Sequence, residues 1–289
     1  MSRETFQFRS RMRSLTDYTV TALSVLSMLL VVTPLVAIFG YLVYKGANSL
    51  NLAFFLKNPA PVGEVGGGMA NSIVGSGVLL AVASAIGVPL GIGGGIYLAE
   101  FGRGTKLANA VRFTADVLNG VPSIVMGLAA YSLVVVPQHH FSSLSGGVAL
   151  GIMMIPTVCR TTEEMLLMVP HAVREAALGL GIPNWRSVLS ITVKTASPGI
   201  ITGCMLAFAR VAGETAPLIF TAFGNPFMST RLNQPIEALP LQIYVYALSP
   251  YDDWHRLAWA GSLVLIALIV LAVSLVRFVT SRGVLKGAS

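Results

Sequence analysis

Charged residues are scarce in this chain. Of its 289 residues, 11% are charged and 54% are hydrophobic, whereas an ordinary soluble domain carries about 25% charged residues. Such a low charge content cannot cover a surface that faces water, so lipid must cover much of the exterior. The scarcity of charge therefore excludes an ordinary soluble domain and predicts an integral membrane protein.

The sequence also lacks the motifs of several kinds of chemistry. It contains no GxxxxGK[ST] phosphate-binding loop, no HExxH and no GxSxG, so we expect no catalytic residues and no ATP hydrolysis by the chain alone. Cys159 and Cys204 lie in apolar segments without CxxC spacing, and His139 and His140 are adjacent. We therefore expect the cysteines to serve packing and predict no metal site.

Six apolar segments are long enough, or nearly so, to cross a membrane as helices of about 20 residues. They are residues 18–44, 70–98, 113–137, 145–165, 196–222 and 257–280. The formal net charge of +7 does not indicate nucleic acid, because the basic residues lie at the ends of these segments. Most of them fall on one side of the membrane if residues 1–17 and the tail 281–289 are cytoplasmic, as the positive-inside rule requires. The pattern predicts an all-α protein with six transmembrane helices and both termini in the cytoplasm.

Glycines recur every four residues in the second apolar segment. Gly87, Gly91 and Gly95 follow the small-xxx-small pattern, which lets two membrane helices approach closely. The stretch follows no soluble strand, which argues against a nucleotide-binding loop. We therefore predict a close helix contact at these glycines.

The fifth segment carries charge near its middle. Arg210 must face protein or water, because an arginine at the centre of a membrane helix costs roughly 2.5–3.5 kcal/mol on insertion scales. Glu214 lies four residues on and would share its face in a continuous helix. Small and hydroxylic residues at helical spacing extend this predicted stripe, namely Gly199, Gly203, Ala207 and Thr221.

Two interpretations of the stripe stay open. Arg210 and Glu214 either form a buried pair that fixes helix register or line a substrate path. An arginine fork suits tetrahedral oxyanions, because it donates two parallel hydrogen bonds. Pro217 interrupts the backbone hydrogen bonds beyond Glu214, and such a break is tolerated only next to protein or water.

Two other sites combine polar residues with an apolar surrounding. Arg160 and Glu164, near the end of the fourth segment, are a second pair spaced by four, although a snorkelling arginine is an equal alternative. Asn119 and Ser123 flank a predicted helix break at Pro122. Polar groups beside a broken membrane helix are common along substrate pathways, but hydrogen bonding between helices explains them equally well.

Residues 170–184 predict a short cytoplasmic helix between two membrane spans. A short apolar face is formed by Val173, Ala177, Leu178 and Leu180. Gly181 is placed to end the helix. A helix of this length has no core of its own. We expect it either to dock in the groove of a partner or to lie on the membrane surface.

The same stretch resembles a known motif. Glu175, Ala176 and Ala177, followed by Gly181, resemble the EAA loop of ABC-importer permease subunits, although Lys194 stands where many members have proline. In that family the loop is the coupling helix, which sits in a cleft of a cytoplasmic ATPase. The resemblance implies the fold of a type I ABC-importer permease for the core over residues 70–280.

A longer segment resembles a narrower family. The run RVAGETAPLIFTA, from Arg210 to Ala222, resembles the phosphate-importer permeases of the PstA family, and residues 120–124, 160–164 and 239–244 match the same family. The resemblance implies a multi-pass subunit in the inner membrane of a prokaryote, which forms half of the translocation pathway of an ATP-driven phosphate importer. It also implies that Arg160 and Arg210 contribute to phosphate passage.

The family resemblance further implies partners and site residues. The partners are a second permease resembling PstC, two copies of a cytoplasmic ATPase that binds ATP and Mg, an extracytoplasmic phosphate-binding protein, and membrane lipid. A permease for another oxyanion, such as sulfate or molybdate, and a membrane enzyme or scaffold are the alternatives. We predict two sites. The substrate pathway is formed by Arg210, Glu214, Arg160, Thr215, Ser123 and Asn119. The coupling site is formed by Glu175, Ala176, Ala177 and Gly181.

Overall fold

The computed structural model describes residues 3–62, 64 and 66–286, and its regular secondary structure there is helical apart from one isolated bridge between Phe223 and Ile236. The last three residues of the predicted tail lie outside the described residues. The helices are α1 (Arg3–Ala47), α2 (Leu52–Leu56), α3 (Ala70–Ile96), α4 (Lys106–Gly120), α5 (Ser123–Ala130), α6 (Val136–Gln138), α7 (Ser143–Leu167), α8 (His171–Gly179), α9 (Asn184–Ser187), α10 (Val193–Ala212), α11 (Ala216–Thr221), α12 (Leu239–Ala247) and α13 (Asp252–Lys286). Three π-helical turns adjoin them, η1 (Tyr97–Phe101), η2 (Tyr131–Val135) and η3 (Val188–Thr192).

Five helical segments of the described chain are long and apolar enough to cross a membrane. A sixth span results if α4 and the helical run Ser123–Gln138, which meet at an angle of 111°, are taken together. The predicted number of spans is therefore reached only with this bent pair. The five continuous segments are Thr16–Ala47, Ala70–Phe101, Ser143–Leu167, Asn184–Ala212 and Asp252–Thr280.

Two predicted spans are broken at proline. The third bends at Val121, whose extended backbone (φ −71°, ψ 133°) is what the following Pro122 favours. The fifth was expected over residues 196–222, but its helix ends at Ala212. The reason is Pro217, which has no backbone N–H and whose ring would clash with the carbonyl of Gly213 in a continuous helix.

The central packing contact joins α3 to α7. An added Cβ at Gly91 would lie 2.6 Å from Cβ of Val158, and one at Gly95 would lie 2.5 Å from Cβ of Thr162. Gly87 faces α7 in the same way, one turn earlier. The prediction of close helix packing at these glycines is confirmed, and the buried core of the bundle surrounds this contact.

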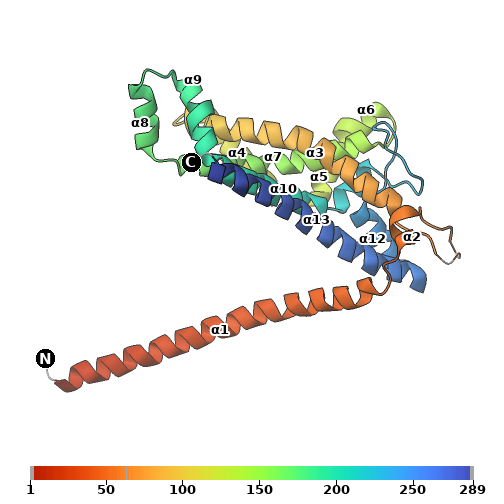
Figure 1. Cartoon of the computed structure of the whole chain (residues 1–289), viewed down its shortest axis with the longest axis horizontal. Coiled ribbons are helices and arrows are strands. Elements are labelled where there is room, and N and C mark those ends of the chain that lie inside the picture. The colour runs from red at the N-terminus through yellow and green to blue at the C-terminus, as the bar shows by residue number, and fades with distance from the viewer. Residues whose placement is uncertain (1–2, 63, 65, 287–289) are drawn as a thin grey trace.

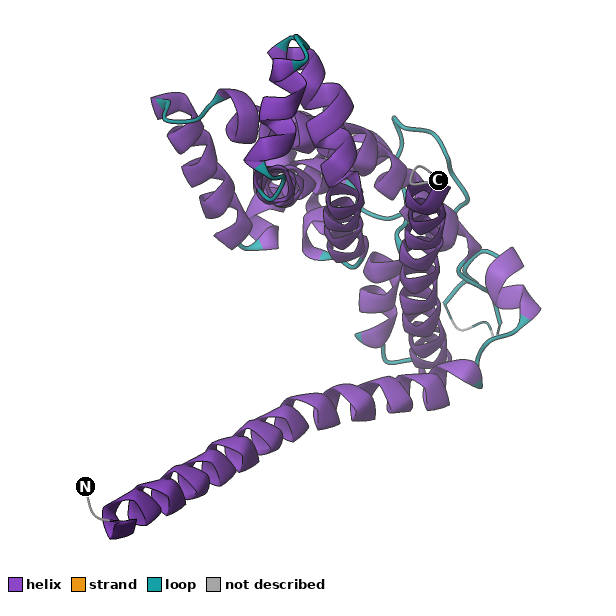
Figure 2. Cartoon of the chain, turned by 60° about the vertical axis from the view of Figure 1, so that its left-hand side comes forward, coloured by secondary structure: helices purple, strands orange, loops and turns teal. Residues whose placement is uncertain are grey.

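Helix α1 stands away from the rest of the bundle (Figures 1 and 2). No residue in the most apolar part of its span is buried. It meets α13 near its C-terminal end, where the rings of Tyr41 and Trp259 are 5.2 Å apart. The start of α1, the loop that carries α8 and α9, and the end of α13 lie toward one end of the long axis (Figure 1). This arrangement is the one that the predicted topology requires of the cytoplasmic side.

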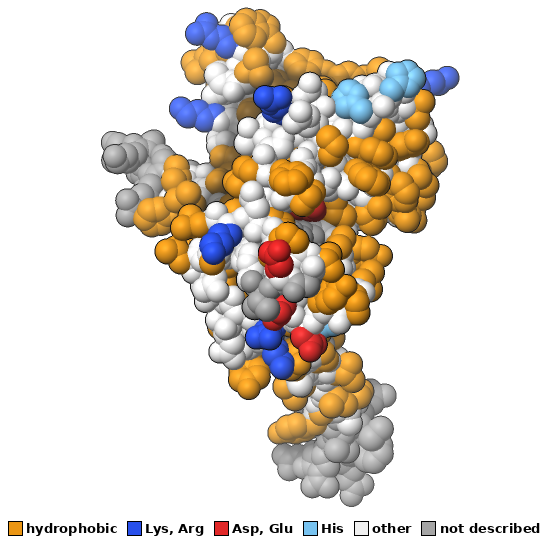
Figure 3. Space-filling model, turned by 90° about the vertical axis from the view of Figure 1, so that its right-hand side faces the viewer, with side chains coloured by type: hydrophobic (Ala, Val, Ile, Leu, Met, Phe, Trp, Pro, Cys, Tyr) orange, Lys and Arg blue, Asp and Glu red, His pale blue; other side chains and the backbone are white. Residues whose placement is uncertain are grey.

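The opposite end of the molecule carries two long connections, one between α1 and α3 and one between α11 and α13 (Figure 1). Both contain a short helix, α2 in one and α12 in the other. Viewed from this end, separate acidic and basic side chains lie among hydrophobic ones (Figure 3). The surface there is more polar than that of an apolar membrane span such as α1.

Candidate functional site

Four charged side chains form a connected cluster between α4 and α7. Nε of Arg112 lies 2.6 Å from Oε1 of Glu163, and Nη1 of Arg160 lies 2.7 Å from the other oxygen, Oε2. Nε of Arg160 in turn lies 3.1 Å from Oδ1 of Asp116. The Glu163 side chain is only 3% exposed, whereas that of Asp116 is 57% exposed. The cluster therefore has a buried side at Glu163 and an open side at Asp116.

The buried carboxylate is fully paired. Removing two charges from water costs several kcal/mol per ion, and good geometry with further hydrogen bonds is needed to offset that cost. Arg112 supplies such bonds, because it also donates to the carbonyl of Leu98 at 3.0 Å and to Oδ1 of Asn109 at 3.2 Å. Glu163 is thus the anchor that fixes both guanidinium groups.

Arg160 has more unused donors than Arg112, which makes three hydrogen bonds. A guanidinium group has five N–H bonds, and within the described part of the chain Arg160 uses Nη1 for Glu163 and Nε for Asp116. Its side chain is partly exposed. The arrangement can therefore present an oriented arginine fork to an anion on the open side of the cluster.

The predicted pairing of Arg160 with Glu164 is wrong. Glu164 is exposed, and the partner of Arg160 on α7 is Glu163, three residues along the helix. Both spacings bring side chains onto neighbouring positions of a helix. Arg160 pairs with Glu163 and not with Glu164 because Arg112 of α4 also binds the Glu163 carboxylate.

The interpretation of Arg210 and Glu214 as a buried pair, one of the two left open, is contradicted. Arg210 lies in the last turn of α10, and Glu214 follows Gly213 in the non-helical break before α11. Neither side chain takes part in the ion pairs found among the described residues. Since the helix ends between them, the two residues do not share one helical face, and Arg210 is left exposed.

The small residues of the predicted stripe serve helix packing. An added Cβ at Gly203 would lie 2.5 Å from Oγ1 of Thr161, and one at Gly199 would overlap Met165, both on α7. Ala207 is buried in the same core. This half of the stripe therefore faces α7 and lines no path.

The structure brings the two broken spans together. A Cβ added at Gly127 of α5 would lie 2.6 Å from Cα of Pro217 in α11, so the two short helices are in close contact. Ser123 begins α5, directly beyond the first break, and Thr215 precedes α11, where its hydroxyl donates to the carbonyl of Pro240 at 3.4 Å. Asn119, before the first break, accepts a hydrogen bond of 3.1 Å from Thr157 of α7.

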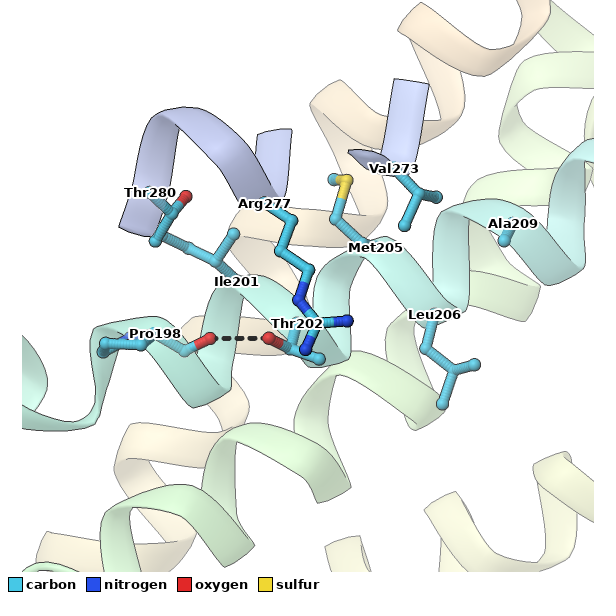
Figure 4. Close-up of a pocket in the computed structure, with 9 residues that line it drawn as sticks. All are labelled: Pro198, Ile201, Thr202, Met205, Leu206, Ala209, Val273, Arg277 and Thr280. Atoms are coloured by element: carbon cyan, nitrogen blue, oxygen red, sulfur yellow. Dashed lines mark hydrogen bonds between the residues drawn. The ribbon is translucent and has the colours of Figure 1, made fainter. Parts of the chain in front are cut away.

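A groove of about 400 Å³ runs between α10 and α13. Its walls are mostly apolar, and Arg277 lies over it near Thr202 (Figure 4). The hydroxyl of Thr202 donates to the carbonyl of Pro198 at 2.8 Å. Leu206 of α10 is a strongly exposed member of the wall. The groove thus lies where α13 covers only part of this face of α10.

The stretch that was expected in the cytoplasm forms a short helix, as predicted. Helix α8 ends at Gly179, and Gly181 has a φ of +76°, a left-handed conformation that glycine adopts without strain. Ile182 donates to the carbonyl of Ala177 at 3.2 Å and Gly181 to that of Leu178 at 2.9 Å. These two bonds are the Schellman arrangement at a helix C-terminus, and they confirm the prediction that Gly181 ends the helix.

One face of this helix is open. Glu175 and Ala176 are exposed, and Ala177 is buried against the bundle. Leu180 and Trp185, just beyond the helix, are large apolar side chains that are strongly exposed. The α8–α9 loop projects from the end of the bundle (Figure 1), so these side chains are accessible to a cytoplasmic partner.

Three members of the charged cluster were missed from the sequence, namely Arg112, Asp116 and Glu163. One signal was available, because Asp116 lies inside the third predicted span and an ionisable residue within a span is a functional candidate. The identity of its partner was not available, because Arg160 is on another helix.

A further acidic residue lies in the connection after α11. Burial raises the pKa of Glu237 to about 7, and hydrogen bonds from the backbone of Ala238 and Asn225 oppose the rise. Its carboxylate is absent from the ion pairs formed by the described residues. No motif or spacing in the sequence singles out Glu237.

Comparisons with known proteins agree on one family. The family model of the binding-protein-dependent transport system inner membrane component matches residues 91–283. The chain is 46% identical over 260 residues to the phosphate transport system permease protein PstA of Yersinia pestis, covering 90% of this chain and 88% of that one. It is 47% identical over 232 residues to the PstA protein of Xylella fastidiosa, covering 80% of each.

A more distant relative and a solved structure extend the comparison. A probable ABC transporter permease protein of Bacillus subtilis, YqgI, is 31% identical and covers 88% of this chain and 91% of its own length. A structure of the MetNI methionine ABC transporter in an inward-facing conformation aligns with a TM-score of 0.57 and 18% identity, over 76% of this chain and 97% of that one. The structural likeness confirms the predicted fold of an ABC-importer permease. The chain therefore belongs to the family of binding-protein-dependent transport system inner membrane components, in which PstA permeases of phosphate transport systems are close relatives.

Proposed function

We propose that this chain is a transmembrane permease subunit of an ATP-driven importer of inorganic phosphate, and that Arg160 is one of the groups that contact phosphate on its way. The observation that carries the proposal is the setting of Arg160. Its guanidinium is held between buried Glu163 and exposed Asp116 and keeps free donors. This setting occurs in a chain whose relatives are named phosphate transport permeases.

The chemistry of the site suits a tetrahedral oxyanion. Phosphate oxygens accept parallel hydrogen bonds from the planar fork of arginine more readily than from the point charge of lysine. The net charge of the cluster is close to zero, because two carboxylates offset two guanidinium groups. Phosphate would therefore be held weakly enough to leave, as transport requires.

Arg210 supplies a second contact in this proposal. It is exposed at the end of α10, and no carboxylate of the described residues neutralises it. It lies just before the break that contains Glu214 and Thr215, close in sequence to the contact between α11 and α5. We assign the surface around the two breaks, including Ser123 and Asn119, to the pathway.

The open face of α8 is assigned to a cytoplasmic ATPase. The ATPase would bind ATP and Mg, and two copies would serve a pair of permeases made of this chain and a second one of the PstC type. A phosphate-binding protein would deliver substrate at the opposite end. Glu175, Ala176 and Gly181 lie on or beside the exposed part of α8, which supports this docking role.

The test is uptake by the assembled complex in proteoliposomes. We expect ATP-dependent uptake of labelled phosphate that excess unlabelled sulfate or molybdate does not suppress. Arg160→Gln should lower uptake strongly while the complex still assembles. Arg13→Gln, at an exposed arginine of α1 that lies outside both proposed sites, is the matched control. Transport of sulfate in preference to phosphate by the unaltered complex would replace the proposed substrate.

A further inference from the structure

Arg174 joins helix α8 to the membrane spans. Its Nη2 lies 2.7 Å from Oε1 of Glu100 and donates to the carbonyl of Leu166 at 2.6 Å, and its Nη1 donates to the carbonyl of Val169 at 3.1 Å. The side chains of Arg174 and Glu100 are 13% and 8% exposed. Unlike neighbouring Glu175, Arg174 therefore points into the protein.

Two of the three acceptors, Glu100 and Leu166, belong to different spans, and the third, Val169, lies in the turn between α7 and α8. Glu100 lies in the π-helical turn η1, at the end of the span that α3 begins. Leu166 lies in the last turn of α7, where helix carbonyls have no partner within the helix. A positive charge at a helix C-terminus is also favourable toward the helix dipole. One guanidinium thus binds α8 to the ends of both α3 and α7.

The hydrogen bond from Arg174 to Leu166 lies close to the charged cluster. Leu166 follows Glu163 by three residues and Arg160 by six, so it is about 4.5 Å and 9 Å from them along the helix axis, at a rise of 1.5 Å per residue. Helices α3 and α7 are packed through Gly91 and Gly95 with no room for an added Cβ. A shift of their cytoplasmic ends would therefore move them together and carry Arg160 with them.

Apolar contacts hold α8 independently of Arg174. Val173 packs against the core of the bundle, and Ala177 is buried. Nε of Arg174 is buried without a hydrogen-bond partner among the described atoms, so the guanidinium retains a donor for a different arrangement of the loop. The position of α8 and the transmission of its movement are thus carried by different side chains.

We propose that Arg174, through its ion pair with Glu100 and its hydrogen bonds to the end of α7, is the positioning residue that passes movement of α8 to the helices that hold the charged cluster. The proposal rests on the proposed function, because it requires an ATPase that moves α8. Its consequence is specific. Without this link the ATPase can still dock on α8, but its cycle no longer drives the bundle.

The experiment compares ATP hydrolysis with phosphate uptake in the reconstituted complex. Removing Arg174 alone would leave Glu100 buried without a partner, which is strongly destabilising, whereas replacing both members of a buried pair with apolar residues is often neutral. The test variant is therefore Arg174→Met with Glu100→Leu. The control is Arg256→Met with Asp253→Leu, which removes an exposed ion pair at the other end of the molecule.

We expect the test variant to retain the ATPase on purification and to hydrolyse ATP, but to import about 5-fold less phosphate per ATP or worse, a loss at the lower end of typical allosteric coupling. Arg174→Lys, which keeps the charge and loses the fork, should fall between the variant and the unaltered complex. The control pair should leave the ratio unchanged.

Three results would overturn the proposal. The first is an unchanged ratio of phosphate uptake to ATP hydrolysis. The second is a fall of both rates in proportion to the amount of complex recovered. The third is loss of the ATPase from the purified variant. The last two would show that the pair only holds the loop in place. Failure of the unaltered complex to import phosphate would instead contradict the proposed function, so the two failures are distinguishable.

Discussion

Glu163 of α7 and Arg112 of α4 are joined by an ion pair of 2.6 Å, in which the carboxylate is almost completely buried. The same carboxylate holds Arg160. This relationship contributes to how the third and fourth spans meet, because Arg160 of α7 binds one oxygen of Glu163 and Arg112 of α4 binds the other. It also leads to the first prediction.

Glu163→Leu should destabilise the protein strongly. The change leaves Arg112 and Arg160 partly buried without their common partner, and breaking a buried pair in this way costs about 3–5 kcal/mol. The measurement is thermal unfolding of the detergent-purified chain. Glu164→Leu is the matched control, because the exposed Glu164 has no ion-pair partner among the described residues, and we expect a change within about 0.5 kcal/mol. Equal effects of the two changes would contradict the cluster.

Arg210→Met should separate transport from stability. No ion pair with a described residue is lost, so the unfolding free energy should change by less than about 0.5 kcal/mol. Uptake of phosphate by the assembled complex should nevertheless fall strongly, and Arg210→Lys should retain part of it because the charge remains. A stability loss as large as that of Glu163→Leu would show that Arg210 has a structural role.

The glycine contact between α3 and α7 can be tested with neighbouring positions. Gly91→Ala places a Cβ 2.6 Å from Cβ of Val158, and such overpacking typically costs about 1–3 kcal/mol. Gly93→Ala meets no atom within 4 Å and should be neutral or stabilising by up to about 1 kcal/mol through helix propensity. Thermal unfolding of the two variants side by side checks this prediction. The helix contact would be misplaced if Gly93→Ala were the more damaging change.

Glu237 should make stability depend on pH. Its pKa in the folded state is raised to about 7 from an ordinary value of 4.5. Between these two pH values the folded state therefore binds a proton that the unfolded state has lost. The stability it contributes is present below about pH 4.5 and is lost as the pH rises through about 7. Glu237→Gln should therefore raise the unfolding midpoint more at about pH 8 than at about pH 5.

The control for this prediction is Glu175→Gln, at an exposed carboxylate. We expect that change to shift the midpoint by the same small amount at both pH values. A larger gain from Glu237→Gln in acid than in alkali would reverse the sign and contradict the burial of the Glu237 carboxylate.

Local properties of the sequence determined much of the fold. The scarcity of charge and the length of the apolar segments were sufficient to predict a membrane protein, because lipid demands long apolar helices, and the predicted six spans are reached when the bent pair is counted as one. The spacing of Gly87, Gly91 and Gly95 was sufficient to predict a close helix contact, and Gly181 to predict the end of α8. Each of these features depends on a short stretch of chain whose own chemistry dictates the outcome.

The tertiary structure alone decided the partners of the charged groups. Glu163 and Glu164 are both within reach of Arg160 on one helix, and the choice between them depends on Arg112 of α4. The ion pair between Arg174 and Glu100 joins residues 74 positions apart, a separation at which spacing carries no information. A buried charge pairs with whichever opposite charge the packed helices bring within about 4 Å, so the packing of the bundle determined these pairs and the sequence pattern did not.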